Sequence, residues 1–189
     1  VTGSISERAV ADAPFAIGVV GRDDLRLAGP QVNLSEALSR VPGLVVSNRS
    51  NYAQDLQISS RGFGVRGLRL LADGIPASGP DGQGQVSQFD IAGAERVEVL
   101  RGPFSVLYGN SSGGVISIFT APVRRDEVEG DLDVGAFGLR QLRGSVATRL
   151  GAGWDLRASA SAMSIDGFRP HSEAQRRTAN VREIGRAHV

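Results

Sequence analysis

The sequence predicts a small α+β domain, with a mixed sheet, short helices and long loops, followed by a series of antiparallel β-strands. Three observations support this fold class. Glycine accounts for 25 of the 189 residues, well above the usual share of about 7%. Short apolar runs alternate with glycine-rich turns in the earlier part of the chain. Longer segments of strict apolar–polar alternation then follow. A helix bundle does not fit this pattern.

The composition excludes several classes of functional site. Without cysteine or lysine, the chain cannot form a disulfide, a thiolate metal site or a P-loop. The net charge of +1 gives no field that would attract nucleic acid, so no nucleic-acid partner is expected. No metal or other cofactor is expected either, because His171 is the only histidine before the last six residues. No apolar run approaches the ~18 residues of a membrane-spanning helix.

The first elements follow from local patterns. Residues 1–14 are small and polar without periodicity, and we expect a flexible arm. Phe15–Val20 is a short apolar run that predicts a strand. An apolar stripe at helical spacing then predicts a helix that Asn33 caps, with Glu36 completing a capping box, and that Pro42 ends. The stripe consists of Leu34, Ala37, Leu38 and Val41.

Short apolar runs between turns predict the remaining strands of this first part. They are Leu44–Val46, which we expect to be buried, and Leu56–Ser60, Leu68–Ala72, Val97–Arg101 and Val115–Thr120. Asp73-Gly74 predicts a turn, and residues 75–89 read as a long polar loop. Pro103 suits the first turn of a short helix at Phe104–Tyr108.

The pattern changes after the charged stretch Arg124–Glu127, which reads as a linker. Three segments of period two follow, at Val128–Ala136, Leu142–Leu150 and Trp154–Ala162, each with one apolar and one polar face. Successive strands of about ten residues are the unit of a transmembrane β-barrel. A soluble antiparallel meander with one wet face is the alternative, and periodicity alone favours it.

Two motifs suggest chemistry, but their context does not support it. Gly109–Gly113 matches G-x-S-x-G around Ser111, with Asp166 and His171 following in hydrolase order. A nucleophile elbow needs a strand before it and a helix after it, and here the predicted order is reversed. Gly62–Gly67 matches G-x-G-x-x-G, but a strand follows where a helix is required. Both are interpreted as glycine turns, and we expect no enzymatic activity.

Taken together, several blocks resemble the plug domain of TonB-dependent outer-membrane receptors. The blocks are Ala37–Leu44, Ile58–Phe63, Leu71–Pro76 and Glu95–Pro103, the last running into Leu107–Ile116. They occur in the family's order and cover about residues 15–121. The resemblance implies an α+β plug domain followed by the first antiparallel strands of a transmembrane β-barrel, which overturns the soluble-meander alternative.

The resemblance also implies a function in the bacterial outer membrane. We expect import of a scarce ligand, most often a ferric siderophore, with the outer-membrane lipid and the energy-transducing protein TonB, with its inner-membrane complex, as partners. The cargo could instead be cobalamin or another metal complex, such as one of copper. A soluble periplasmic signalling or binding module built on the plug fold is the alternative of another class.

Several residues take roles from the resemblance. Val1, Thr2 and Gly3 look like the tail of the TonB box, the peptide that TonB pulls. Arg61 and Arg101 resemble plug arginines that pair with carboxylates of the barrel wall. Loops within residues 49–54, 64–66 and 77–83 would face the extracellular vestibule and touch ligand. Their candidate contact residues are Arg49, Tyr52, Gln54, Gly64, Arg66, Ser78 and Gln83.

The expected organisation is therefore an arm at residues 1–14, a plug domain at 15–121, a linker at 122–127 and the first barrel strands at 128–183. Residues 184–189 form a separate case. They match the translation of a widely used sequencing adapter, which predicts that they are not biological.

Overall fold

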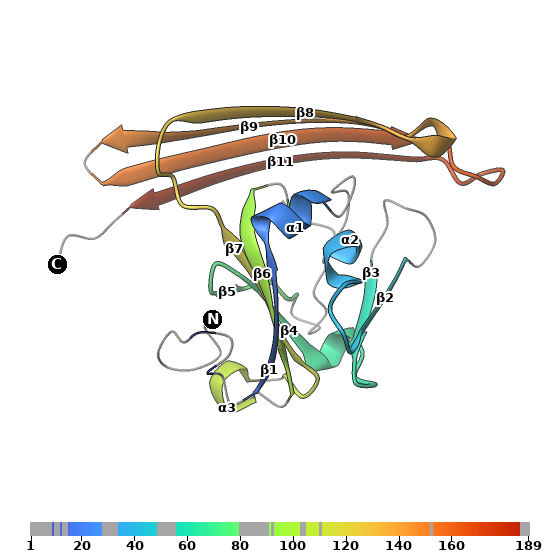
Figure 1. Ribbon diagram of the computed structural model, residues 1–189, viewed down its shortest axis with the longest axis vertical. Helices are drawn as coiled ribbons and strands as arrows, with labels where there is room; N and C mark the ends of the chain where they lie inside the picture. Colours follow the sequence, from blue (N-terminus) through green and yellow to red (C-terminus); the bar gives the residue numbers. More distant parts are fainter. Residues whose placement is uncertain are drawn as a thin grey trace. The chain divides into compact units, whose positions relative to one another are not determined.

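The chain is described by a computed structural model covering residues 9, 12, 15–27, 34–48, 56–79, 91, 93–102, 105–109, 111–151 and 153–185. The described residues up to Thr120 form one compact unit, and those from Ala121 onward form a second. Each unit is built around its own β-sheet (Figure 1).

The first unit contains a five-stranded mixed sheet. Its strands are β1 (Ala16–Gly21), β4 (Leu68–Ala72), β5 (Ile75–Pro76), β6 (Ala94–Arg101) and β7 (Gly114–Thr120). They lie in the order β1-β6-β7-β4-β5. The pairing of β4 with β7 is parallel and the other pairings are antiparallel. The mixed sheet predicted from the sequence is therefore confirmed.

Short helices cover one face of this sheet. They are α1 (Arg22–Leu27) and α2 (Leu34–Leu38), while α3 (Ser105–Tyr108) and the 3₁₀ turn η2 (Val65–Gly67) lie elsewhere in the unit. The predicted stripe of α2 is buried and packs into the main core with strand residues such as Val97 and Ile116. The expected cap Asn33 lies outside the described residues. Helix α1 was not predicted, because Leu25 is its only buried side chain.

The opposite face of the sheet has a smaller apolar cluster. Leu71, Leu100 and Val115 are buried there, with Phe15, Ile17 and Tyr108 packed against them. Strand β6 alternates between the two clusters, since Val99 faces the helices and Leu100 faces away from them. The sheet is thus buried on both faces.

A separate two-stranded ladder pairs β2 (Leu44–Asn48) with β3 (Leu56–Ser60). The predicted strand at Leu44–Val46 is present, but the prediction that it is buried is wrong, because Val45 is 66% exposed and Leu44 and Val46 are only half-buried. In a two-stranded ladder only one face can pack on the core, and Val45 occupies the other face. Ile58 on β3 is buried in the main core.

The second unit is an antiparallel meander of four long strands (Figure 1). They are β8 (Glu127–Val134), β9 (Arg140–Gly151), β10 (Trp154–Ile165) and β11 (Ala174–Gly185). The first three correspond to the predicted segments, although β8 ends before the 3₁₀ turn η4 (Ala136–Gly138). Strand β11 was not predicted individually, because charged Arg177 and Glu183 interrupt its apolar positions.

The two faces of this second sheet differ sharply. Side chains on one face are largely apolar and exposed: Val128, Leu132, Val134, Leu142, Val146, Leu150, Trp154 and Val181. The other face has carboxylates, arginines and hydroxyl groups at the alternating positions. None of the helices that the structure describes is long and apolar enough to cross a membrane.

Candidate functional site

Arg61 and Arg101 lie at the same end of the first unit. Arg61 occupies a tight turn after β3, with φ of 51° followed by 85° at Gly62, and Ser60 and Phe63 exchange backbone hydrogen bonds of 2.9 Å across it. Such consecutive positive φ values are typical of a two-residue hairpin turn. Ser60 pairs with Leu44, which lies two residues after Pro42. The Pro42 carbonyl accepts a 2.6 Å hydrogen bond from Arg101 Nη1, which brings Arg101 to the same end of the unit.

The two arginines differ in how the fold holds them. The Arg61 side chain is exposed, and no hydrogen bond or ion pair from the described residues holds it. Arg101 is half-buried and fixes the turn after α2 through Pro42. Its Nε is buried and has no hydrogen-bond partner within the described ranges. A guanidinium has five N–H donors, so Arg101 keeps donors available for a further acceptor.

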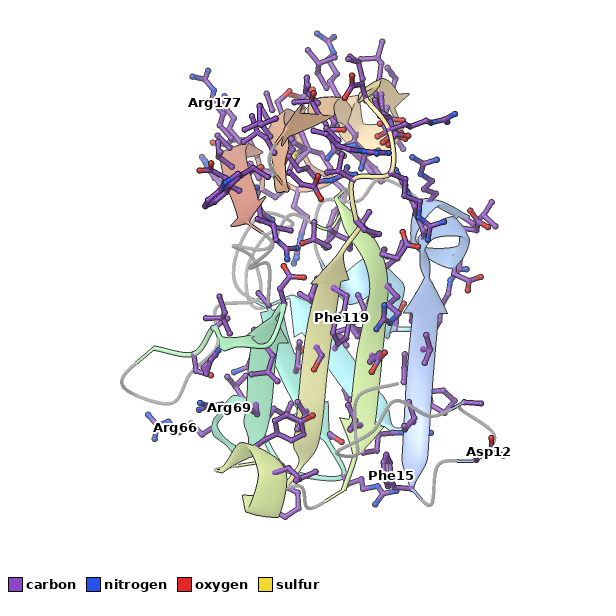
Figure 2. All side chains as sticks on the ribbon, turned by 90° about the vertical axis from the view of Figure 1, so that its left-hand side faces the viewer. Asp12, Phe15, Arg66, Arg69, Phe119 and Arg177 are labelled. Carbon is purple, nitrogen blue, oxygen red and sulfur yellow. The ribbon has the colours of Figure 1, made fainter. Side chains whose placement is uncertain are left out.

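The candidate ligand-facing residues fall at different places. Gly64 and Arg66 follow the Arg61 turn, and the Arg66 side chain extends outward from the edge of the unit (Figure 2). Ser78 follows β5, where the Ala77 N–H donates to the Leu70 carbonyl at 2.9 Å. Outside the described residues are Val1, Thr2, Gly3, Arg49, Tyr52, Gln54 and Gln83.

The two ends of the β2–β3 ladder have different neighbours along the chain. Leu44 and Ser60 pair at one end of the ladder, next to Arg61 and Gly64, while Asn48 and Leu56 pair at the other end. The predicted segment 49–54 begins directly after Asn48. Strand β2 therefore ends, at Asn48, at the end of the ladder opposite Arg61.

The hydrolase-like motif lacks the geometry of a nucleophile elbow. Helix α3 precedes it and strand β7 follows it, which is the reverse of the order that the elbow needs. The Ser111 side chain is fully buried, and its hydroxyl donates to the Gly109 carbonyl at 3.3 Å. Asp166 and His171 belong to the second unit. Within the part of the chain that the structure describes, no three acidic or histidine side chains gather to hold a metal ion.

Gly67, the last residue of the G-x-G-x-x-G stretch, and the distant Gly113 allow two loops to pack closely, whereas an added Cβ at Gly62 or Gly64 would meet no atom within 4 Å. The Gly113 N–H donates to the Gly67 carbonyl at 2.8 Å, which brings two loops together. A Cβ at Gly113 would lie 2.6 Å from the Phe63 Cβ, so a larger residue does not fit. Strand β4 follows this stretch directly, so no helix N-terminus is available for a pyrophosphate.

Sequence reasoning missed an ion pair on the sheet, of which the carboxylate is buried and the arginine is partly exposed. The Glu98 side chain is fully buried on β6, and its Oε1 accepts a 2.7 Å hydrogen bond from Arg96 Nε. The Arg96 guanidinium also lies 4.1 Å from the centre of the Phe119 ring on β7. A carboxylate between Val97 and Val99 was the available signal, since an acidic residue within an apolar run needs a partner when buried.

Ion pairs also cross the polar face of the second sheet. Arg143 Nη2 lies 3.1 Å from Asp133 Oδ2, and Arg157 Nη2 lies 4.0 Å from Glu127 Oε2. Further along, the Ser161 and Thr178 hydroxyl groups are 2.5 Å apart. These groups face the same side because their strands are in register. The sheet therefore combines a polar, internally bonded face with an exposed apolar one.

This two-faced sheet has the alternation expected of a barrel wall between lipid and an aqueous lumen. Apolar residues of β8 and β9 pair with one another in register, as Val128 does with Val146 and Leu132 with Leu142. Trp154 lies beside the short β9–β10 turn, at the end of the apolar face. The charged Arg177 side chain extends outward from β11 (Figure 2).

The chain has clear relatives. A family model described as the TonB-dependent receptor plug domain matches residues 9–115. The chain is 32% identical over 177 residues to the vitamin B12 transporter BtuB of Photobacterium profundum, covering 92% of this chain and 29% of that protein. It is 34% identical over 121 residues to a hemin receptor of Yersinia enterocolitica, covering 64% of this chain and 17% of the relative. The chain thus spans less than a third of either relative.

A solved structure shares the fold. The pyoverdine outer-membrane receptor FpvA from Pseudomonas aeruginosa PAO1 superposes with a TM-score of 0.67 at 24% identity, over 90% of this chain and 25% of that one. The mixed sheet of the first unit, the matched family model and the two-faced strands that follow agree with one another. The chain therefore belongs to the family of TonB-dependent receptors of the bacterial outer membrane, as a plug domain followed by the first strands of an unclosed barrel.

Proposed function

We propose that the protein to which this chain belongs imports a scarce, large ligand across the outer membrane, in a step that TonB energises. The single observation that carries this proposal is the order of the two units. A plug domain is followed directly by strands with one apolar face and one polar, ion-paired face. A soluble periplasmic module on the plug fold would be expected to have a polar surface, and not a row of exposed leucines and valines.

The proposed role involves no bond chemistry. The matched relatives are described as a transporter and a receptor. The buried hydroxyl of Ser111, held by the Gly109 carbonyl, also argues against a nucleophile. Binding and release of the ligand, with a movement of the plug, are sufficient for import.

Two ligand classes are candidates, and both are metal complexes. A ferric siderophore is the cargo that the sequence resemblance implies. A vitamin B12-like or hemin-like complex is favoured by the names of two relatives above 30% identity. The candidate contact residues are those of the three predicted loops, among which Gly64, Arg66 and Ser78 are described and exposed or half-buried.

The proposed contact with TonB lies at Val1, Thr2 and Gly3. A peptide that pairs by its main chain with an edge strand needs free backbone N–H groups. Thr2→Pro removes one such group, and we expect it to abolish uptake while ligand binding persists. Ala11→Pro, outside the proposed contact, is the matched control and should leave uptake unchanged.

The test uses the full-length receptor from the source genome, expressed in cells with and without TonB. Uptake of three labelled probes is measured: a panel of ferric siderophores, cyanocobalamin and hemin. We expect one class to enter only when TonB is present, and the class that enters identifies the cargo. Equal uptake in both strains for every probe would contradict the proposed function.

A further inference from the structure

The first barrel strand, β8, carries an unusual row of charge. Glu127, Glu129, Asp131 and Asp133 occupy every second position, so all four carboxylates lie on the polar face of the sheet. The alternate positions include Val128 and Leu132 on the exposed apolar face. The polar positions of β8 therefore hold acidic residues only.

Neighbouring strands neutralise only part of this row. Arg143 on β9 reaches Asp133, and Arg157 on β10 reaches Glu127 across the intervening Ala147. Asp131 is exposed and lies opposite Arg143 in the register, yet the guanidinium contacts Asp133 instead. No ion pair from the described residues reaches Asp131.

The other edge of the sheet has the opposite sign. The polar-face positions of β11 include Arg176 and Arg182, and none of those positions holds an acidic residue. Arg182 lies directly opposite Arg157, so two like charges face each other across one strand pair. The polar face thus changes from acidic at β8 to basic at β11.

Both outer strands expose a backbone edge. In the order β11-β10-β9-β8, strand β8 pairs with β9 alone and β11 with β10 alone, as far as the described residues go. An unpaired edge of a membrane-facing sheet requires a further strand, because lipid offers no hydrogen bonds to free N–H and C=O groups. Charged side chains directly opposite one another across a strand pair favour opposite signs.

We propose that the free edge of β8 is covered by a strand of the same full-length protein that presents Arg or Lys at alternate positions on the polar face. By the same rule, the strand beside β11 presents Asp or Glu on that face. The opposite charges on the two sides of each edge would favour the correct strand as the neighbour of β8 and of β11 when the barrel forms. The inference rests on the barrel of the family and is independent of the cargo.

Photo-crosslinking of the folded full-length receptor tests the proposal. A benzoylphenylalanine replaces Gly130 on β8, where an added Cβ meets only the Arg143 carbonyl oxygen at 3.9 Å. A second variant carries it at Ala179, an exposed position on the apolar face of β11. Mass spectrometry then identifies the captured segments. We expect a segment with basic residues on its polar face from Gly130, and one with acidic residues from Ala179.

A captured segment at Gly130 that is neutral or acidic on its polar face would overturn the proposal. The same is true if both positions capture segments of the same sign. Loss of ligand uptake together with capture of the expected strands would count against the proposed function only, so the two failures are distinguishable.

Charge reversal gives an independent test. In the full-length receptor, the double variant E129K/D131K should lower the thermal midpoint of the folded protein by roughly 2–4 °C. The neutral variant E129Q/D131N, of nearly equal volume, should lower it less. Reversing the basic residues of the captured strand to Glu should restore the E129K/D131K midpoint. An unchanged midpoint in E129K/D131K, or no restoration, would contradict the proposed pairing.

Discussion

The carboxylate of Asp73 holds Thr120 at two points: Oδ1 accepts the backbone N–H and Oδ2 accepts the hydroxyl, each at 2.8 Å. The Asp73 N–H in turn donates to the Ile118 carbonyl at 2.8 Å. Asp73 is in the left-handed region, with φ of 50°, in the turn that joins β4 to β5. This contact therefore fixes the turn to the last residue of β7, directly before the chain enters the second unit.

Replacement of Asp73 by alanine should destabilise the first unit. The variant loses two charge-assisted hydrogen bonds and keeps a left-handed backbone that Ala tolerates poorly, so we expect a loss of roughly 2–3 kcal/mol. Asp73→Asn should cost less, because asparagine tolerates this conformation and its amide oxygen still accepts one hydrogen bond. Urea unfolding of the chain measures both, and equal losses in the two variants would contradict this account.

Gly114 should be among the least replaceable residues of the sheet. It has φ of 134°, and a Cβ there would run into the Leu100 carbonyl oxygen on β6. Gly114→Ala should therefore cost about 3 kcal/mol or more, because neither backbone can move without breaking the β6–β7 ladder. Gly74 is the matched control: its φ is 83°, but no atom lies within 4 Å of an added Cβ. Gly74→Ala should cost about 1 kcal/mol, and urea unfolding that ranks the two equally would refute the steric argument.

Most strands could be predicted from the sequence because apolar runs and glycine turns are local signals. Leu56–Ser60 and Leu68–Ala72 agree with β3 and β4 at both ends. Helix α1 could not be found in this way, since a six-residue helix with one buried leucine has no periodic stripe. Strand β11 could not be predicted from alternation, because two charged side chains occupy its apolar face. One of them, the long Arg177, can extend its charge beyond the apolar surface.

The contacts of Arg101 and of the turn at Asp73 were less accessible to sequence reasoning, because they join distant positions. The Asp73–Thr120 contact spans 47 residues, and the Arg101–Pro42 contact spans 59. The family motif alone indicates Arg101, and no local pattern indicates that it also anchors the turn at Pro42. Likewise, the acidic row of β8 was visible as alternation, but its partners Arg143 and Arg157 depend on the strand register.

The apolar face of the second unit predicts a strong asymmetry between adjacent residues of β9. The Val146 side chain is 46% exposed and lies on the apolar face, in register with Val128, Ala158 and Val181 of the other three strands. Ser145 lies on the polar face, opposite Glu129. In the full-length receptor, Val146→Arg should cost roughly 2–4 kcal/mol near the middle of the bilayer, and Ser145→Arg much less. The folded fraction in lipid vesicles measures the difference. Similar folded fractions would mean that this face does not contact lipid.

Asp126, just before β8, should titrate below the ordinary range. The Thr148 hydroxyl and then the Arg149 N–H donate to its carboxylate, and these bonds lower its pKa from 3.8. The pKa of Asp126 is lower in the folded chain than in the unfolded chain. The stabilisation that its ionised carboxylate gives the folded state is therefore fully present above about pH 4 and is lost as the pH falls below 3.8. Carboxyl carbon NMR should give a midpoint below 3.8, and Thr148→Val should raise it. A wild-type midpoint at or above that value would contradict the assignment.

The proposed plug–barrel pairing predicts a leaky pore when its arginines are removed. In the full-length receptor, Arg61→Ala and Arg101→Ala should each increase sensitivity to large antibiotics, because a separable ion pair that holds the plug is lost. Comparing the two variants separates the loss of a plug–barrel ion pair from a loss of stability of the first unit. Arg101→Ala also loses the Pro42 contact and should cost about 1 kcal/mol in urea unfolding of the chain, whereas the exposed Arg61 makes no such bond. Arg61→Ala with unchanged stability and raised sensitivity supports the pairing, and unchanged sensitivity in both variants argues against it.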